Sequence, residues 1–406
     1  MPVTPSSSST FSSRWRRSAC HGLVFAAMAH GAIYAPAASA AVAQAVDRSI
    51  PSYRPQPVPQ PHDRGYIMRD GSIRIIGYDD MADMVARWNA IFAKSHPGIR
   101  FTPILKGDGT AIPAITYDTT AFAPEGGGAT ELELLPYEKI YGSKKDPVAA
   151  LIIRVAHGSL NSAAKMSPLG IVVNKSNPIK SLTEEQAAAI FATGSGDGDI
   201  TNWSQIGVGG NLANKPIHPA GLYWDNYMRP EDPNVGEYMM YRKMGAYPGH
   251  VFSPNYEQYL HYGEVTKKIA SDPQSIGIVA LNKVTPDVRV VPILGKDGKA
   301  LSTGTRAELL ANAYPYARDL YIYIRREPGT AFDPLVKEYM RLVLSKEGQE
   351  AVAQDVKGYM PLGAADVAKE LGKLNAADTW APRSKQGPKL NFPFPSPFPS
   401  GEAEGQ

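Results

Sequence analysis

Two adjacent carboxylates lie where the sequence indicates the start of a helix. In the stretch IIGYDDMADMVARW an apolar run passes through Gly77 into residues with helical spacing, and Asp79 and Asp80 fall at the turn. The first turn of a helix offers backbone N–H groups, which an aspartate can cap and which a small anion can bind. The pair therefore has two interpretations, a helix cap or part of a ligand site.

A second glycine turn follows the next apolar run, IRFTPIL. In this turn Lys106 is followed by Gly107, Asp108, Gly109 and Thr110. Glycine turns that open helices can bind anions through their backbone N–H groups, so two such turns indicate a small-anion site. Ordinary strand-to-helix turns without a ligand give the same pattern.

The sequence motifs of several enzyme and metal-site classes are absent. There is no Walker lysine motif, no H-E-x-x-H, no complete EF-hand loop and no G-x-S-x-G elbow. The histidines at positions 157, 218, 250 and 261 are too widely separated to form a metal motif. We therefore expect a binding protein without a cofactor or metal, and not an enzyme.

Residues 1–45 have the pattern of a secretory signal peptide. They contain no Asp or Glu, three arginines precede a mildly apolar run, and small residues such as Ala38-Ser39-Ala40 follow. A membrane anchor is the less favoured alternative, because the apolar run is shorter than the ~20 residues of a spanning helix. The only cysteine, Cys20, falls in this segment, so a mature periplasmic or secreted chain would have no thiol.

The charge balance and the ends of the chain limit its partners and its organisation. Without the predicted leader, 39 basic residues stand against 39 acidic ones, so we expect neither nucleic acid nor an anionic membrane as a partner. Residues 46–70 are rich in proline and are interpreted as a disordered linker, and residues 376–406 as a disordered tail. The roughly 300 residues between them exceed a typical domain and suggest two lobes.

The apolar pattern predicts an α/β fold. Strands are expected in the runs VAALIIRVA, LGIVVN, SIGIVAL, VRVVPIL and LYIYI. Ser181 and Glu184 have the spacing of a capping box, and Asp333-Pro334 is typical of a helix start. The stretch TTAFAPEGGGAT is expected to form a loop.

A long stretch, NKSNPIKSLTEEQAAAIFATGSGDGDITNWSQIG, resembles the periplasmic phosphate-binding proteins of ABC transporters. DPQSIGIVAL and YPYARDLYIYI agree with the same family, and the resemblance spans about Ile73 to Leu362. It implies a two-lobed type II periplasmic binding protein fold with hinge crossover strands. Lobe one would comprise residues 71–165 and 318–375, and lobe two residues 166–317.

The resemblance also implies a ligand site, which differs here from the family pattern. Carried over position by position, the ligand-binding residues are Asp79, Asp80, Gly107, Asp108, Gly109, Thr110, Phe122, Arg229, Gly236 and Glu237. Acidic residues stand where the family has hydroxyls, and Phe122 replaces an aspartate unless it belongs to the core. Ionised carboxylates only accept hydrogen bonds, so each exchange weakens phosphate binding.

The resemblance implies an exported, monomeric solute-binding protein that closes two lobes around a small ligand and delivers it to an ABC permease. Phosphate is the ligand that the family implies, and another small polar ligand is the alternative. A second interpretation is a relative that has lost phosphate binding and serves as a secreted or surface protein. A hydrolase using the cleft carboxylates is the least favoured interpretation.

Overall fold

The structure is a computed structural model that describes residues 45–129, 131–141, 150–194, 198–223, 228, 230–232, 235, 238–239, 251–295, 301–326 and 331–377. Residues 1–44 of the predicted leader and residues 378–406 of the predicted tail lie outside this part. Within it, we find no helix that combines the length and the apolar character needed to cross a membrane.

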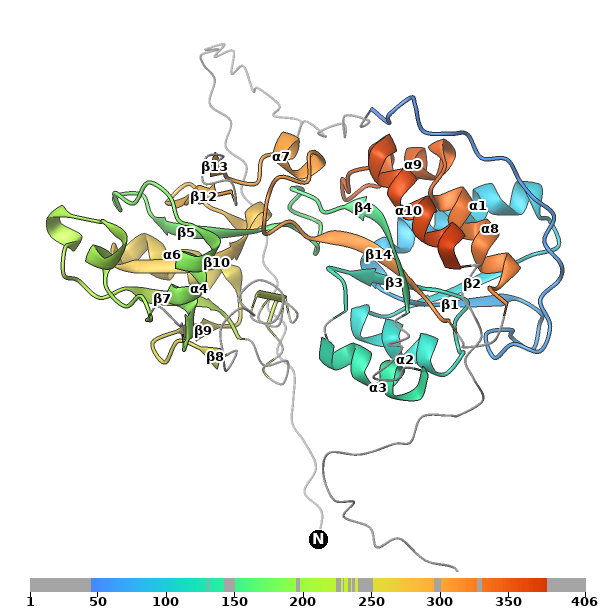
Figure 1. Ribbon diagram of the computed structural model, residues 1–406, viewed down its shortest axis with the longest axis horizontal. Coiled ribbons are helices and arrows are strands. Elements are labelled where there is room, and N and C mark those ends of the chain that lie inside the picture. Colours follow the sequence, from blue (N-terminus) through green and yellow to red (C-terminus); the bar gives the residue numbers. More distant parts are fainter. Residues whose placement is uncertain are drawn as a thin grey trace, which may run out of the picture. The chain divides into compact units, whose positions relative to one another are not determined.

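Lobe 1 is an α/β unit with two small sheets. Its strands are β1 (Ile73–Gly77), β2 (Phe101–Leu105), β3 (Ala123–Gly126), β4 (Leu151–His157) and β14 (Asp319–Ile324). Its helices are η1 (Asp79–Met81), α1 (Ala82–Ser95), η2 (Asp108–Thr110), α2 (Ala111–Thr116), α3 (Glu131–Tyr141), α8 (Pro334–Val343), α9 (Lys346–Ala353) and α10 (Ala364–Ala376). β1 and β2 pair in parallel, whereas β14 pairs antiparallel with β3 and β4. Helices α1, α8, α9 and α10 group on one side of these strands, and α2 and α3 on the other (Figure 1).

The packing of lobe 1 follows from the pattern of its first strand and helix. Alternate residues of β1 are buried, and α1 buries Met84, Val85, Trp88 and Phe92 on one face. β1 then ends at Gly77, where a Cβ would lie 2.3 Å from the carbonyl oxygen of Pro124. Only glycine allows this approach, which sets where the chain leaves the strand.

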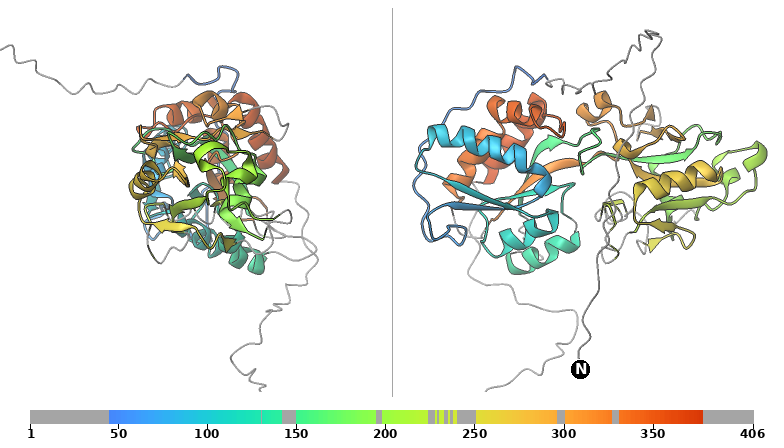
Figure 2. Two further views of the ribbon diagram at one scale, coloured as in Figure 1. Left: turned by 90° about the vertical axis from the view of Figure 1, so that its left-hand side faces the viewer. Right: turned by 180° about the vertical axis from the view of Figure 1, so that it is seen from behind.

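Lobe 2 is built on a mixed sheet of five strands, in the order β11-β5-β10-β7-β9. These strands are β5 (Leu169–Asn174), β7 (His218–Leu222), β9 (Glu257–Tyr259), β10 (Ser275–Ala280) and β11 (Val288–Val290). Smaller elements are α4 (Glu184–Phe191), β6 (Ala192–Thr193), η3 (Trp203–Ile206), η4 (Gly210–Leu212), β8 (Val251–Phe252), α6 (Tyr262–Ser271), η7 (Leu281–Lys283), β12 (Ile293–Leu294), β13 (Leu301–Ser302) and α7 (Arg306–Leu310). Helix α6 runs along β10 and β7, as Figure 2 shows from behind.

Three local predictions need correction. The stretch expected as a loop contains β3, an edge strand that tolerates Pro124 because an edge strand can spare one backbone donor. Helix α4 is capped by Thr183 and Gln186, two residues after the predicted pair, with both reciprocal hydrogen bonds formed. The run VRVVPIL is divided into β11 and β12, because Pro292 has no N–H to donate to a ladder.

Residues 46–70 are not a disordered linker, which corrects the prediction from their composition. They form an extended segment, here called the strap, along the side of lobe 1 that carries α8 and α9 (Figure 1). The N–H of Gln56 and the hydroxyl of Tyr53 each donate to Glu338 at 2.8 Å, and the N–H of Tyr53 donates to Glu347 at 2.6 Å. Carboxylates of α8 and α9 thus satisfy backbone N–H groups of the strap at Tyr53 and Gln56.

Candidate functional site

A pocket of about 250 Å³ receives residues from both lobes and from the connection between them. Its described lining residues are Tyr78, Asp79, Lys106, Gly107, Asp108, Ser162, Ala163, Ala164, Lys165, Met166, Glu231, Asp232, Tyr262, Ala280, Asn282 and Lys283. Both predicted glycine turns therefore reach one pocket. Of the predicted site residues, Asp79, Gly107 and Asp108 lie on its wall.

The two adjacent aspartates of the first glycine turn lie in different environments. Asp79 faces the pocket and pairs with Lys165, whose Nζ lies 2.7 Å from Oδ2 of Asp79. Asp80 is only 2% exposed and is not on the pocket wall. Neither side chain caps η1 or α1 by a hydrogen bond, so the capping interpretation is wrong for both.

Asp80 instead forms a buried polar cluster with the segment between α9 and α10 and with the connection between the lobes. Its carboxylate accepts hydrogen bonds from Nζ of Lys357 and the hydroxyl of Tyr359, and from the N–H of Lys165 at 3.0 Å. Burial and the neighbouring Asp80 carboxylate raise the pKa of Tyr359 well above its usual value, so this hydroxyl stays a donor. The ion pair with Lys357 and the two hydrogen bonds compensate the burial of the Asp80 charge.

The second glycine turn presents a carboxylate to the pocket. Gly107 has a φ of 126°, a conformation that L side chains rarely adopt, and it directs the chain into η2. Burial raises the pKa of Asp108, and the nearby carboxylates of Glu133 and Asp232 raise it further. Thr110 does not line the pocket, and its hydroxyl donates to the carbonyl of Gly107 at 2.7 Å. Gly109 is exposed and also lies off the pocket wall.

Phe122 lies in the core of lobe 1, the alternative that the sequence left open. It is fully buried and packs on Tyr339 with ring centroids 4.4 Å apart. Its side chain does not line the pocket, so the position-by-position expectation of a ligand contact is corrected. Arg229, Gly236 and Glu237 lie outside the described residues.

Asp232 and Tyr262 of lobe 2 contact Arg318, which directly precedes β14, in a buried cluster beside the pocket. The guanidinium of Arg318 is 1% exposed and donates to both oxygens of Asp232, at 2.5 and 3.2 Å. The hydroxyl of Tyr262 donates to Asp232 at 3.0 Å. On the pocket rim Nζ of Lys283 lies 3.1 Å from Oε1 of Glu231. Each of these carboxylates therefore has a cationic partner within the protein.

The charges of the pocket wall are largely balanced internally. Asp79 pairs with Lys165, Glu231 with Lys283, and Asp232 with Arg318, in contacts between residues far apart in the chain. Asp108 is the wall carboxylate for which burial and neighbouring charges favour the protonated form. A ligand that enters must therefore offer donors to the ion-paired carboxylates Asp79, Glu231 and Asp232, whose oxygens only accept hydrogen bonds.

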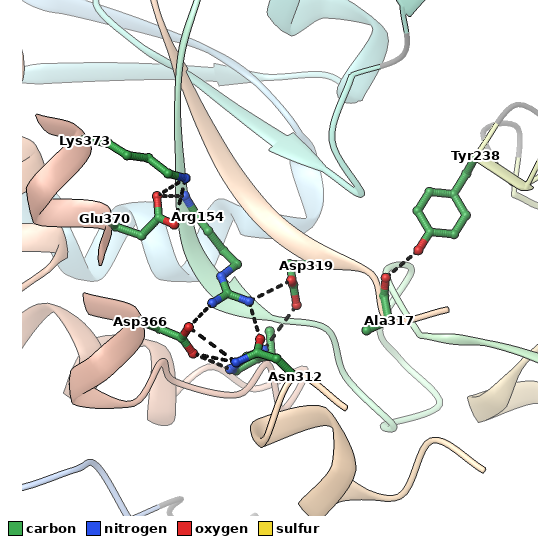
Figure 3. Close-up of polar contacts among 9 residues, drawn as sticks. Arg154, Tyr238, Asn312, Ala317, Asp319, Asp366, Glu370 and Lys373 are labelled. Atoms are coloured by element: carbon green, nitrogen blue, oxygen red, sulfur yellow. Dashed lines mark hydrogen bonds and ion pairs between the residues drawn. The ribbon is translucent and has the colours of Figure 1, made fainter. Parts of the chain in front are cut away.

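The two crossover strands are fixed beside each other by a second polar cluster (Figure 3). Arg154 of β4 binds Asp319 of β14 at 3.2 Å and also binds Asp366 of α10. Asn312, which follows α7, accepts from Arg154 at 2.5 Å and donates to Asp366 at 3.1 Å. Asp319, also bonded to His157, has a pKa below its usual value despite its burial.

Sequence reasoning missed several wall residues. Lys165 and Asn282 belong to no recognisable motif. Glu231 and Asp232 lie between Arg229 and Gly236, two residues that the resemblance implied as ligand-binding, but were not themselves singled out. Tyr262 is the last of eight tyrosines between positions 223 and 262, and this aromatic enrichment is a signal by which it could have been found.

Comparisons with known proteins identify the family. Residues 68–347 match the family model of the PBP superfamily domain, and the chain belongs to this superfamily. It is 29% identical over 308 residues to the phosphate-binding protein PstS of Pseudomonas aeruginosa, which covers 75% of this chain and 87% of that protein.

Solved structures of similar proteins cover most of the chain at low identity. PstS from Borrelia burgdorferi has a TM-score of 0.48 and 18% identity, covering 71% of this chain and 98% of its own. An ABC-type phosphate transport receptor from Vibrio cholerae has a TM-score of 0.46 and 18% identity, covering 71% and 99%.

The family model confirms the predicted periplasmic binding protein class, and the two lobes described above confirm the predicted two-lobed α/β fold. The interpretation as a solute-binding protein and not an enzyme is confirmed as well.

Proposed function

We propose that this protein binds a small oxyanion, phosphate, in the pocket between its glycine turns and lobe 2. The observation that carries the proposal is that one pocket gathers Asp79 and Asp108 from lobe 1, Lys165 from the connection, and Tyr262 and Asn282 from lobe 2. In a two-lobed binding protein, a ligand that touches both lobes stabilises their closed arrangement. The similarity to the phosphate-binding protein of Pseudomonas aeruginosa supports phosphate as the ligand.

The carboxylates of the pocket favour phosphate over a fully deprotonated oxyanion. The ion-paired carboxylates Asp79, Glu231 and Asp232 only accept hydrogen bonds, so the ligand must donate to them. Hydrogen phosphate carries a P–OH group, whereas sulfate at neutral pH has no hydrogen to donate. Lys106 at the second turn and Lys165 supply positive charge for the remaining oxygens.

We further propose that the protein is exported to the periplasm, acts as a monomer and delivers its ligand to an ABC permease. The basic, apolar and small-residue order of residues 1–45 supports export. The family membership supports delivery to a permease, because a solute-binding protein needs a membrane partner for transport.

Calorimetric titration of the protein with phosphate, arsenate and sulfate tests the proposed ligand. We expect saturable phosphate and arsenate binding and at least tenfold weaker sulfate binding, a difference of about 1.4 kcal/mol. Binding of none of the three anions would overturn the proposal. Equal affinity for sulfate and phosphate would refute the role given to the carboxylates.

A further inference from the structure

The connection between β4 and β5, residues 158–168, forms one side of the pocket and is here called the hinge loop. It closes on itself through a hydrogen bond of 3.0 Å from the N–H of Ser159 to the carbonyl of Met166. Residues 162–166 of the loop line the pocket. The position of the hinge loop therefore sets the shape of that wall.

Lobe 1 holds the hinge loop through Asp80. The buried Asp80 carboxylate accepts the N–H of Lys165 at 3.0 Å. Tyr359, whose hydroxyl donates to Asp80, also accepts the N–H of Met166 at 3.2 Å. Two successive backbone donors of the loop are thus bound by one polar cluster.

Lobe 2 holds the same loop through Asn282 of η7. The side-chain Nδ2 of Asn282 donates to the carbonyls of Asn161 and Ala164 at 2.8 and 2.9 Å. Its backbone N–H donates to the hydroxyl of Ser167 at 3.2 Å. These three bonds tie the start, the middle and the end of the loop to lobe 2.

Asp80 and Asn282, here called the two anchors of the hinge loop, bind the same peptide group. The carbonyl of Ala164 and the N–H of Lys165 belong to the same planar unit, and they point to opposite sides of it. Asn282 binds the carbonyl side and Asp80 binds the amide side. The Ala164–Lys165 peptide therefore bridges the two lobes at the pocket wall.

We propose that Asp80 and Asn282 are positioning residues for the ligand pocket, which hold the Ala164–Lys165 peptide from opposite lobes and so fix the hinge loop for ligand binding. The inference rests on the proposed function for the identity of the probe, phosphate. A wall held in place before binding spares the ligand the entropic cost of ordering it. Losing either anchor would release the same peptide.

The test combines alanine variants, a conservative variant and two readouts. Asp80→Ala and Asn282→Ala are expected to speed hydrogen exchange of amides in residues 159–166 by about tenfold or more. Each is expected to weaken phosphate binding by about tenfold, because the ligand must then order the freed loop, and this entropic cost reduces the free energy of binding. In the double variant the effect on affinity should be less than the product of the single effects, since both residues act on one peptide.

Asp80→Asn separates the anchor from the buried charge. Its amide oxygen can still accept the N–H of Lys165, although the ion pair with Lys357 is lost. We expect this variant to keep the protection of residues 159–166 and to bind phosphate within about threefold of the wild type. An exchange rate as high as that of Asp80→Ala would contradict the anchoring role.

Matched controls lie elsewhere in each lobe. Asp333 accepts the hydroxyl of Tyr66 at 2.6 Å and the N–H of Leu335 at 2.9 Å, which resembles the bonding of Asp80. In lobe 2, Nδ2 of Asn174 donates to the carbonyls of residues 269 and 270 at 3.0 and 2.7 Å, as Asn282 does to two carbonyls. Asp333→Ala and Asn174→Ala should lower the unfolding temperature but leave hinge-loop exchange and phosphate affinity unchanged.

The outcomes separate this inference from the proposed function. If the wild-type protein does not bind phosphate, the proposed function fails, and hydrogen exchange alone decides the inference. Unchanged exchange in residues 159–166 of Asp80→Ala and Asn282→Ala would overturn it. So would equal increases in the control variants, or wild-type phosphate affinity in both anchor variants.

Discussion

The two glycine turns of lobe 1 have the same local design and different roles. Each follows a strand of the β1–β2 pair, and each carries acidic residues into a short 3₁₀ helix. The first turn binds Asp80 into a buried cluster, whereas the second presents Asp108 to the pocket. The two carboxylates have different neighbours. Asp80 accepts hydrogen bonds from Lys357 and Tyr359, whereas Asp108 lies near the carboxylates of Glu133 and Asp232. An acidic residue at a family ligand position is therefore not by itself a ligand contact.

Removing the buried carboxylate should have the largest effect on stability. Asp80→Ala is expected to lower the free energy of unfolding by about 3 kcal/mol, because it leaves Lys357, Tyr359 and a backbone N–H without their acceptor. Urea denaturation followed by circular dichroism measures the change. A loss below about 1 kcal/mol would show that the cluster is not a structural anchor.

A second carboxylate near the same cluster makes stability depend on pH. Burial raises the pKa of Asp355 to about 6, and the charges of Asp83 and Asp80 add to the effect. Because the folded pKa lies above the unfolded one, the stabilisation is fully present below about pH 4 and is lost as pH rises through 6. We expect the wild type to lose about 1–2 kcal/mol over this window after solvent screening.

Asp355→Asn should remove this loss, because its amide oxygen can still accept the N–H of Lys357 while carrying no charge. Urea denaturation of both proteins at pH 4, 5, 6 and 7 gives the comparison. A variant whose stability falls with pH as steeply as the wild type would assign the dependence to another group.

A substitution in the second glycine turn, which lines the pocket, should change the affinity for phosphate. Asp108→Asn removes a negative charge from the wall, so phosphate should bind about tenfold more tightly, a gain of ~1.4 kcal/mol. Calorimetry at pH 8, where more of the wild-type carboxyl is ionised, should show the gain most clearly. Weaker phosphate binding would mean instead that the Asp108 carboxylate accepts a hydrogen bond from the ligand.

The smallest effect is expected at Asp79. Its carboxylate is 41% exposed and pairs with Lys165, which is 59% exposed, so the pair is screened by solvent. Asp79→Asn should change the free energy of unfolding by less than about 0.5 kcal/mol. A loss comparable with that of Asp80→Ala in the same urea denaturation would remove the contrast between the two neighbours.

The sequence predicted the fold better than it predicted the site. Apolar runs and glycine turns located β1 and β2, because strand patterns and turn residues act locally. The role of Asp80 could not be inferred, since Lys357 and Tyr359 lie 277 and 279 residues away and belong to no motif. Burial of that kind is a property of tertiary packing.

Predictions from local sequence were also wrong where contacts with distant residues determine the structure. The proline-rich strap was expected to be disordered, and carboxylates of α8 and α9 bind it to lobe 1. Phe122 stands at a family ligand position, but packing against Tyr339 places it in the core. In contrast, Asp333 was predicted as the start of a helix and does cap α8, because a cap needs only neighbouring residues.

Phosphate titration of Asp108→Asn and Asp80→Asn beside the wild type tests the contrast between the two turns most directly. Both substitutions remove one negative charge without changing side-chain size. We predict about tenfold tighter binding for Asp108→Asn and no gain for Asp80→Asn, because only Asp108 lines the pocket. Equal gains in the two variants would contradict the account, since Asp80 would then act on the ligand as a pocket residue does.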